Sequence, residues 1–376
     1  MKNRTISILL AMVMVLSTAS MCVFADTPQD VGEVEVVADE QGEATTAKEA
    51  TEPAQEDEDT PTPEPAPQPP ATPQWVETYS AWKSLAIEWD PVADASYYKI
   101  YRNGVWIDTV NANGPNSPFR YRKKMYINYG LPEDGSVYNY QVSAVKGNLE
   151  SGLSSVVCDG AMQPMTLSFT MRQTKKLTSH DGSKIKYTFN KGQRIQAFGY
   201  AMGKYKFYYP VNGVNRLFYV QKSRIRKPAA NYTRWSNYSP EEAEYFVYTT
   251  GVRSATSNLI FASLYTQHIY VMRNIGGLYR INDIPYRGAV YTHWEMASGT
   301  ASTPSPSGFN LKINKRIKRH SSARWWNCYH SMSAIHGKSG RNGSGVPRSH
   351  GCIRNPDPNA EFIYKGTAKG TRVIVY

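Results

Sequence analysis

Short segments that alternate apolar and polar residues, separated by turn residues, recur along this sequence from residue 75 onward. Examples are Ser84–Trp89, Tyr97–Arg102 and Tyr138–Val145. Alternation with a period of two is the pattern of a β-strand with one buried face. Dipeptides such as Asn103-Gly104 close these runs, as tight turns between strands require. The sequence therefore predicts a mainly β protein, and its 376 residues allow several domains.

The first residues have the composition of an export signal. Lys2 and Arg4 give a positive start, the apolar run Ile6–Leu16 follows, and small residues end at Ala25. This order predicts a signal peptide over residues 1–25, cut after Ala25. A membrane anchor is the alternative, but the run is shorter than the ~20 apolar residues that cross a bilayer. We expect a secreted chain, located in the cell wall or outside the cell, with no transmembrane segment after cleavage.

Charge divides the chain after the signal into two unequal parts. Residues 26–74 carry 14 acidic residues and one lysine, are rich in proline and lack aromatic residues. Such a segment buries too little apolar surface to fold, so we expect a disordered tether. Residues 75–376 carry a formal net charge of +23, which favours an anionic partner. Outside the cell that partner is an anionic wall polymer rather than nucleic acid, the alternative being a generally basic solvated surface.

Residues 75–160 have the strand pattern of a β-sandwich. Trp89, Leu131 and Tyr138 stand where fibronectin type III modules have their buried Trp, their Leu and their corner Tyr, and the segment resembles such a module. On this interpretation Trp89 and Tyr138 are core residues, and the module is a spacer or a weak adhesion unit.

Residues 164–228 predict a smaller barrel of short strands. Turn dipeptides such as Met202-Gly203 and Asn212-Gly213 separate runs rich in Tyr and Phe, and the segment resembles a bacterial SH3-type wall-targeting domain. Residues 229–257 are expected to connect this barrel to the rest. They contain one short helix from Pro240, capped by Ser239.

Three cysteines lie outside the signal, at positions 158, 328 and 352. An odd number in an exported chain leaves at least one free thiol unless two chains pair. A bridge between Cys158 and Cys328 stays open, because spacing alone does not fix disulfide geometry.

The last third, residues 258–376, is expected to be all β, with its chemistry at strand ends and on one loop. Cys352 follows Ser349-His350-Gly351, and His336 lies sixteen residues before it. A thiolate is a nucleophile, an imidazole is its usual base, and the flexible Gly351 lets backbone N–H groups approach a developing oxyanion. These parts suffice for acyl transfer. Zinc binding by the His and Cys residues is one alternative, but paired ligand spacings are missing. A buried structural thiol is another, but polar neighbours such as His350 and Arg354 make Cys352 a poor fit to an apolar core.

Four features of this segment resemble the L,D-transpeptidase catalytic domain of the YkuD type. They are the hairpin around Gln267, the loop Thr303-Pro304-Ser305-Pro306-Ser307-Gly308, the strand end Ile335-His336-Gly337 and the sequence Ser349-His350-Gly351-Cys352-Ile353-Arg354.

The resemblance implies a role for each residue of the site. Cys352 would attack the carbonyl of an L,D amide in a peptidoglycan stem peptide, and His336 would accept the thiol proton, oriented by the Gly337 carbonyl. Ser349, His350 and Gly351 would form the signature loop, and the backbone N–H groups of His350, Gly351 and Cys352 would hold the oxyanion. Arg354 would shape this loop or bind a substrate carboxylate. The resemblance further implies acylation by carbapenems, and neither a metal nor a cofactor is expected.

Two other functions remain open at this stage. The same thioester can be hydrolysed, which would make the protein an L,D-carboxypeptidase that trims stems. The two β modules favour a different class, a wall-binding or adhesion protein. The acceptor amine and the orientation of the modules do not follow from the sequence.

Overall fold

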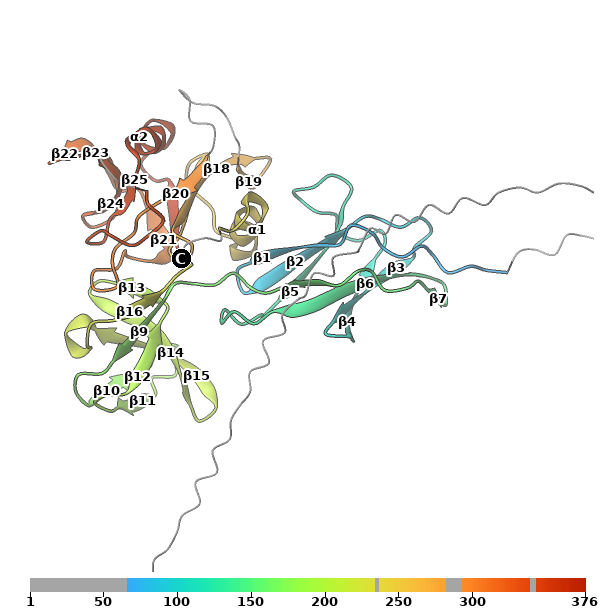
Figure 1. The fold of residues 1–376 in the computed structure, drawn as a ribbon, viewed down its shortest axis with the longest axis horizontal. Coiled ribbons are helices and arrows are strands. Elements are labelled where there is room, and N and C mark those ends of the chain that lie inside the picture. Colours follow the sequence, from blue (N-terminus) through green and yellow to red (C-terminus); the bar gives the residue numbers. More distant parts are fainter. Residues whose placement is uncertain (1–65, 234–236, 282–291, 339–342) are drawn as a thin grey trace, which may run out of the picture. The chain divides into compact units, whose positions relative to one another are not determined.

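The computed structural model describes residues 66–376 except 234–236, 282–291 and 339–342, and these residues are mainly in β-strands (Figure 1). The expected signal peptide and the tether up to residue 65 lie outside the described residues, and 66–76 contain neither helix nor strand. The predicted mainly β fold is confirmed. No described helix has the length and apolarity needed to cross a membrane.

Residues 77–159 form two antiparallel sheets. One sheet has the order β1-β2-β5, and the other has the order β4-β3-β6-β7 with β8 also paired to β6. The core contains Trp89 and Tyr98, which are fully buried and meet edge to face at 5.2 Å between ring centroids. The strands are β1 (Glu77–Ala81), β2 (Ser84–Trp89), β3 (Tyr97–Arg102), β4 (Val105–Asn111), β5 (Lys124–Tyr129), β6 (Tyr138–Lys146), β7 (Leu149–Glu150) and β8 (Val157–Asp159).

Of the two aromatic core residues expected here, Trp89 is buried but Tyr138 is only half-buried. The fully buried tyrosine of β6 is Tyr140, whose hydroxyl accepts a hydrogen bond of 2.7 Å from Asn128. Tyr138 lies at the start of the strand, where the core ends.

Residues 166–231 form three small sheets, with the orders β10-β11, β12-β9-β16 and β13-β14-β15. Phe189, Phe207 and Phe218 pack against one another in their interior. The elements are β9 (Thr166–Thr170), β10 (Lys175–Thr178), β11 (Lys186–Phe189), β12 (Arg194–Ala197), β13 (Gly199–Ala201), β14 (Lys204–Val211), β15 (Val214–Gln221), the 3₁₀ turn η1 (Lys222–Arg224) and β16 (Ala229–Asn231).

The helix expected after Ser239 is present as α1 (Pro240–Thr250). Ser239 Oγ accepts from the Glu242 N–H at 3.1 Å while the Glu242 carboxylate accepts from the Ser239 N–H at 2.6 Å. This capping box satisfies two backbone donors that a helix start leaves unpaired. Phe246 stacks on Phe261 at 4.5 Å, so α1 is part of a core rather than only a connector.

Residues 258–376 contain two sheets, and their strand pairing fixes the candidate site. The first has the order β19-β18-β17-β26-β21 with β20 paired to β18, and the second has the order β22-β23-β24-β25. The expected hairpin is β17–β18, and β26 and β25 each join a neighbour in parallel. The strands are β17 (Asn258–Ser263), β18 (His268–Ile275), β19 (Leu278–Ile281), β20 (His293–Glu295), β21 (Gly308–Lys312), β22 (Lys315–His320), β23 (Ala323–His330), β24 (Ser333–Lys338), β25 (Ile353–Asn355) and β26 (Arg372–Val375).

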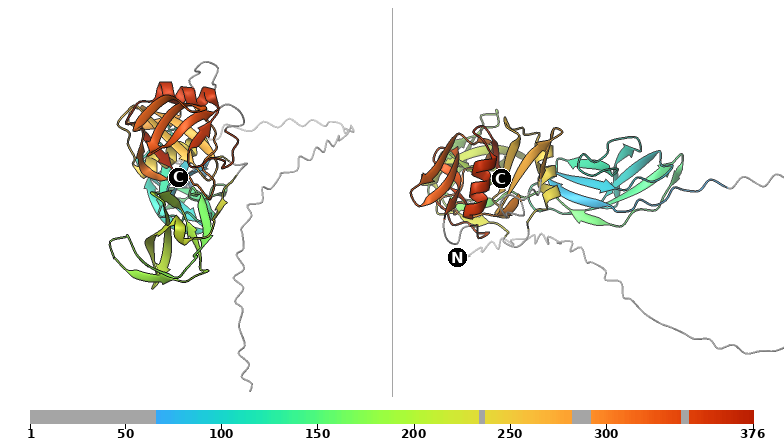
Figure 2. Two further views of the ribbon diagram at one scale, coloured as in Figure 1. Left: turned by 90° about the vertical axis from the view of Figure 1, so that its left-hand side faces the viewer. Right: turned by 90° about the horizontal axis from the view of Figure 1, so that it is seen from above.

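A second helix, α2 (Asp357–Gly366), corrects the all-β prediction for this segment. It packs across β23 and β24 (Figure 2), with Ala360 and Ile363 buried. The pattern was easy to miss, because the helix starts after Pro356 without a side-chain cap and has only two buried positions.

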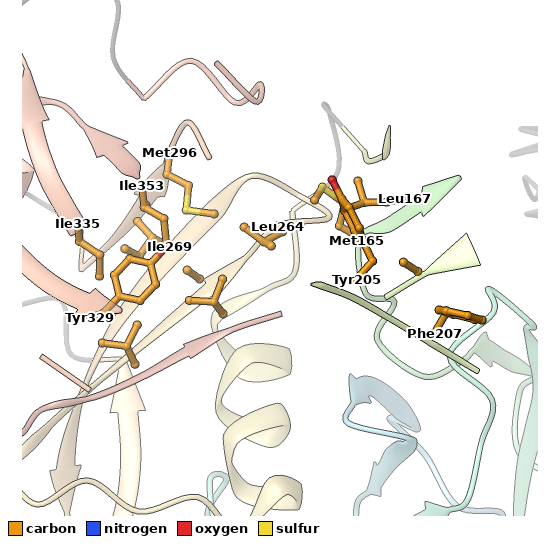
Figure 3. Packing of buried hydrophobic residues seen from close by; sticks show 14 of the residues in the cluster. Met165, Leu167, Tyr205, Phe207, Leu264, Ile269, Met296, Tyr329, Ile335 and Ile353 are labelled. Carbon is orange, nitrogen blue, oxygen red and sulfur yellow. The ribbon is translucent and has the colours of Figure 1, made fainter. Parts of the chain in front are cut away.

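The barrel of residues 166–231 and the sheets of residues 258–376 share one hydrophobic cluster. Met165, Leu167 and Tyr205 belong to it together with Ile335 and Ile353, and Leu264 lies between the two groups (Figure 3). Segments predicted as separate modules therefore have a continuous interior.

Candidate functional site

Strands β24 and β25 bring the predicted nucleophile and base onto one face of a sheet. They run parallel, with Ile335 opposite Ile353 and His336 opposite Arg354. Because side chains alternate between faces, Ala334 and His336 point to the same side as Cys352 and Arg354. Ile335 and Ile353 point into the hydrophobic cluster on the other side. Among the described residues, no hydrogen bond joins the Cys352 thiol to the imidazole, so their direct contact stays a prediction.

The loop before Cys352 is held by Ser349. The Ser349 hydroxyl accepts a hydrogen bond of 3.0 Å from the Gly351 N–H and donates to the Cys352 carbonyl. Gly351 has φ +120°, a conformation that residues with a Cβ rarely adopt. The Gly351 N–H is thus engaged in the resting loop, whereas those of His350 and Cys352 bond to no other described residue. Of the three donors expected to hold an oxyanion, these two are available.

The loop Thr303–Gly308 supports Ser349 from the other side. The Ser349 carbonyl accepts from the Thr303 hydroxyl at 3.1 Å and from the Thr300 N–H at 3.0 Å. Ser305 Oγ accepts from the Gly299 N–H at 2.9 Å, which closes the loop on itself. The proline-rich loop and the Ser349–Cys352 segment are therefore one hydrogen-bonded unit.

Gln267, which the resemblance singled out, is fully buried and positions the segment leading into this loop. Its side-chain oxygen accepts from the Ser298 N–H at 2.9 Å, and its amide donates to the Ser298 hydroxyl at 2.8 Å. Its φ of +57° allows the tight turn between β17 and β18.

The His336 imidazole is 4% exposed, and its Nδ1 lies 3.0 Å from the Gly337 carbonyl oxygen. A carbonyl only accepts, so Nδ1 carries the hydrogen and Nε2 is left as an acceptor. The Gly337 carbonyl therefore holds the ring in this orientation.

Trp326 of β23 covers one face of that imidazole. The centroids of the two rings are 4.6 Å apart, with 6° between their planes. The ring of His320 also contacts Trp326, at 4.7 Å between centroids. The β23–β24 register shifts between Arg324 and Asn327, and Trp325 has φ +60°. A β-bulge of this kind re-aims the side chain that follows it. Sequence reasoning missed Trp326, because a bulge leaves no clear sequence pattern.

Burial sets the charge state of both groups. It lowers the pKa of His336, as do Arg354 and Lys338, while the Gly337 hydrogen bond and Asp357 raise it. Burial raises the pKa of the Cys352 thiol, against the Ala334 backbone N–H and the Arg354 guanidinium, which favour the thiolate. The resting pair at neutral pH is accordingly a thiol and a neutral imidazole.

The other candidate residues have distinct surroundings. His350 is exposed, and Arg354 is half-buried with its Nε unpartnered among the described residues.

Cys328 is a buried free thiol on β23, so the bridge between Cys158 and Cys328 is not formed. Asn355, which received no role from the sequence, is fully buried and accepts a hydrogen bond of 2.8 Å from Trp294. No cluster of three or more metal-ligand side chains occurs in the described ranges.

Replacing Gly337 with alanine should destabilise the site. A Cβ there would overlap the Asp357 carboxylate and press on Ala360 of α2, so we expect a loss of about 1–3 kcal/mol in unfolding free energy. Denaturant unfolding measures it. Gly366→Ala is the matched control, since nothing lies within 4 Å of that position. An unchanged midpoint for Gly337→Ala would contradict the packing described here.

Several solved proteins have partial structural similarity to this chain. A fused zinc-dependent amidase/peptidase/peptidoglycan-binding-domain protein from Clostridium acetobutylicum is 21% identical, with 36% of this chain and 59% of that chain covered and a TM-score of 0.30. An L,D-transpeptidase from Stackebrandtia nassauensis is 16% identical, covering 33% and 57% with a TM-score of 0.27. L,D-transpeptidase 3 from Mycobacterium tuberculosis is 14% identical, covering 56% and 81% with a TM-score of 0.28.

This chain spans less than two thirds of the length of the first two of these proteins. Among curated proteins, no relative matches it. The YkuD family, described as an L,D-transpeptidase catalytic domain, matches residues 177–375. The match begins inside the predicted SH3-like segment, in agreement with the shared hydrophobic cluster, and it includes the strands and the loop that carry His336 and Cys352. Because it covers more than half of the chain, the protein belongs to the YkuD family of L,D-transpeptidase catalytic domains.

Proposed function

We propose that this protein is an exported L,D-transpeptidase that cross-links peptidoglycan stem peptides through a thioester on Cys352. One observation carries the proposal: the His336 imidazole, whose Nδ1 bonds the Gly337 carbonyl and leaves Nε2 as an acceptor, shares a sheet face with the partly buried thiol that immediately precedes the neighbouring strand β25. Nucleophile, base and orienting group are the parts that covalent acyl transfer needs. The predicted signal peptide supports export, and the fibronectin-like and SH3-like segments would hold the enzyme at the wall.

In the first half of the reaction, Nε2 of His336 accepts the proton of the Cys352 thiol while the sulfur attacks the carbonyl carbon of the amide before a terminal D-alanine. The N–H groups of His350 and Cys352 donate to the oxyanion that forms. The imidazolium then protonates the departing nitrogen, the C–N bond breaks, and D-alanine leaves. A thioester on Cys352 and a neutral imidazole remain.

In the second half, a side-chain amine of a neighbouring stem attacks the thioester carbonyl. His336 accepts a proton from that amine and returns it to the departing sulfur, so that an amide cross-link and the free thiol result. Arg354 lies opposite His336 in the register and favours the thiolate electrostatically. Its Nε is buried and unpartnered among the described residues, so a contact with a substrate carboxylate would come from the terminal nitrogens of the guanidinium.

Mass spectrometry of the products tests the proposal. The protein is incubated with disaccharide-tetrapeptide fragments, and cross-linked dimers that have lost one D-alanine are the expected product. Trimmed monomers alone would replace the proposal by an L,D-carboxypeptidase. A carbapenem adduct on Cys352, located by digestion and intact mass, would support the thioester in either case. No product and no adduct would refute both functions.

Trp326 should act as a positioning residue for the base. Trp326→Leu removes the stacked ring and admits water, so the pKa of His336 rises toward its ordinary value. The acid limb of the pH–rate profile for carbapenem acylation should then move to higher pH, with a rate loss of about 10- to 100-fold. Trp326→Phe should restore most of the rate and the profile. Trp325→Leu is the control, because Trp325 packs on Tyr364 of α2 instead. An unshifted limb in Trp326→Leu would exclude the positioning role.

A further inference from the structure

The part of the chain that builds the site has an unusual charge distribution. Residues 296–356 contain ten Lys and Arg residues and no Asp or Glu. Several of these cations lie on β22, where Lys315, Lys318 and Arg319 are exposed. None of the three forms an ion pair within the part of the chain that the structure describes. We call these three residues the β22 cation strip.

The strip lies on the sheet that carries the candidate nucleophile. β22 is its edge strand, followed by β23, β24 and β25. Lys315 pairs with Cys328, Cys328 pairs with Ala334, and the parallel register sets Ala334 beside Cys352. Strands in a sheet are about 4.8 Å apart, so the strip runs along the sheet edge about 14 Å from the nucleophile's strand.

The neighbouring cation Arg316 contacts α2 within the protein and so differs from the three residues of the β22 cation strip. The Arg316 guanidinium donates to the Tyr364 carbonyl and lies over the Tyr364 ring, 4.3 Å from its centroid. Arg316 thus fixes α2 to the sheet. Among the described residues, Lys315, Lys318 and Arg319 make no comparable contact. Lys315 and Arg319 lie on one face of the sheet and Lys318 on the other, so the exposed charges follow the edge strand on both of its faces.

We propose that the β22 cation strip binds a linear polyanion of the cell wall, a phosphodiester polymer, and so holds the Cys352 site against the wall. A row of exposed cations along a sheet edge fits a linear chain of anions. No described carboxylate forms an ion pair with any of the three, and the 61 residues around them in the sequence contain no acid. The inference rests on the proposed export, since only an exported protein meets such a polymer.

Edge-strand lysines and arginines have another well-known effect, which is to prevent pairing with a second sheet edge. If that were the whole role of the strip, neutralising it would cause self-association and leave polyanion binding unchanged. The two roles are therefore separable by measuring both quantities on the same variant.

The test uses the mature chain with Lys315→Gln, Lys318→Gln and Arg319→Gln combined. Lys175→Gln, Lys176→Gln and Lys186→Gln on the exposed β10–β11 hairpin form a control with the same charge change. Binding to inorganic polyphosphate is measured over a salt series, and size-exclusion chromatography reports the oligomeric state. The strip variant should bind at least roughly tenfold more weakly, with a salt dependence of log K shallower by about two. The control should stay within about twofold of wild type.

Binding to wall sacculi identifies the source of the anions. Wild type should sediment with intact sacculi and lose most of this binding after hydrofluoric acid removes the phosphodiester polymers. Equal binding before and after that treatment, equal losses in both triple variants, or no polyphosphate binding by wild type would each overturn the proposal. Release of D-alanine from a soluble tetrapeptide should be unchanged in the strip variant. Because binding is measured without turnover, failure of the strip and failure of the proposed activity are told apart.

Discussion

Replacing Cys352 with serine is expected to abolish acyl transfer, with D-alanine release falling by at least roughly 10⁴-fold. A serine hydroxyl is far less acidic and a far weaker nucleophile than a thiol. The substitution is nearly isosteric, so the Ser349–Cys352 loop should keep its hydrogen bonds and the protein should stay folded. Release of D-alanine from tetrapeptide stems measures the loss, and circular dichroism checks the fold.

Cys328→Ser is a matched control for this experiment. Cys328 is the other described free thiol, fully buried one strand beyond Ala334. If the assignment is right, Cys328→Ser still releases D-alanine and still forms a carbapenem adduct, whereas Cys352→Ser does neither. Turnover of Cys352→Ser within tenfold of wild type would remove the thioester mechanism.

His336→Gln should cost about 10²- to 10⁴-fold in the rate of acylation. Glutamine can still donate to the Gly337 carbonyl, but it has no basic nitrogen for the thiol proton. The remaining rate then depends on spontaneous ionisation of Cys352, whose pKa burial raises. It should climb about tenfold per pH unit through the neutral range, whereas the wild-type rate levels off once His336 is neutral. Carbapenem acylation followed by mass against pH distinguishes the two profiles.

Two further histidines serve as controls for the base. His330 is half-exposed at the far end of β23, and His350 is exposed beside Gly351. His350 is proposed to act through its backbone N–H, so His350→Gln should preserve most of the rate, as should His330→Gln. A pH profile like that of His336→Gln in either control would move the base to that residue.

Local sequence patterns predicted the parts of this protein that depend on neighbouring residues. The alternating strands, the hairpin around Gln267 and the start of α1 after Ser239 follow from patterns within about ten residues. The loop ending at Cys352 was found in the same way, since Gly351 is needed for its conformation.

What the sequence could not predict depends on contacts between distant segments. Trp326 reaches His336 only because a bulge turns it there. The helix α2 is stabilised by its contacts with β23 and β24 rather than by a cap. Met165 and Ile335 belong to one hydrophobic cluster although they lie far apart in the chain. The short apolar segments that contain them do not indicate, as sequences, that they pack in the same core. Such features arise from tertiary packing, which overrides local preference.

The pairing of β26 has a consequence for how the enzyme is made. This strand lies between β17 and β21 in its sheet, and it leaves the ribosome roughly 110 residues after β17. Until then β17 has an open edge, and the first sheet of the catalytic segment cannot be completed. If the chain is exported as proposed, it must stay unfolded in transit, and a central strand that is made late delays completion of this sheet until β26 has been synthesised. The order of the strands thus postpones assembly of the first sheet of this segment until β26 has been made.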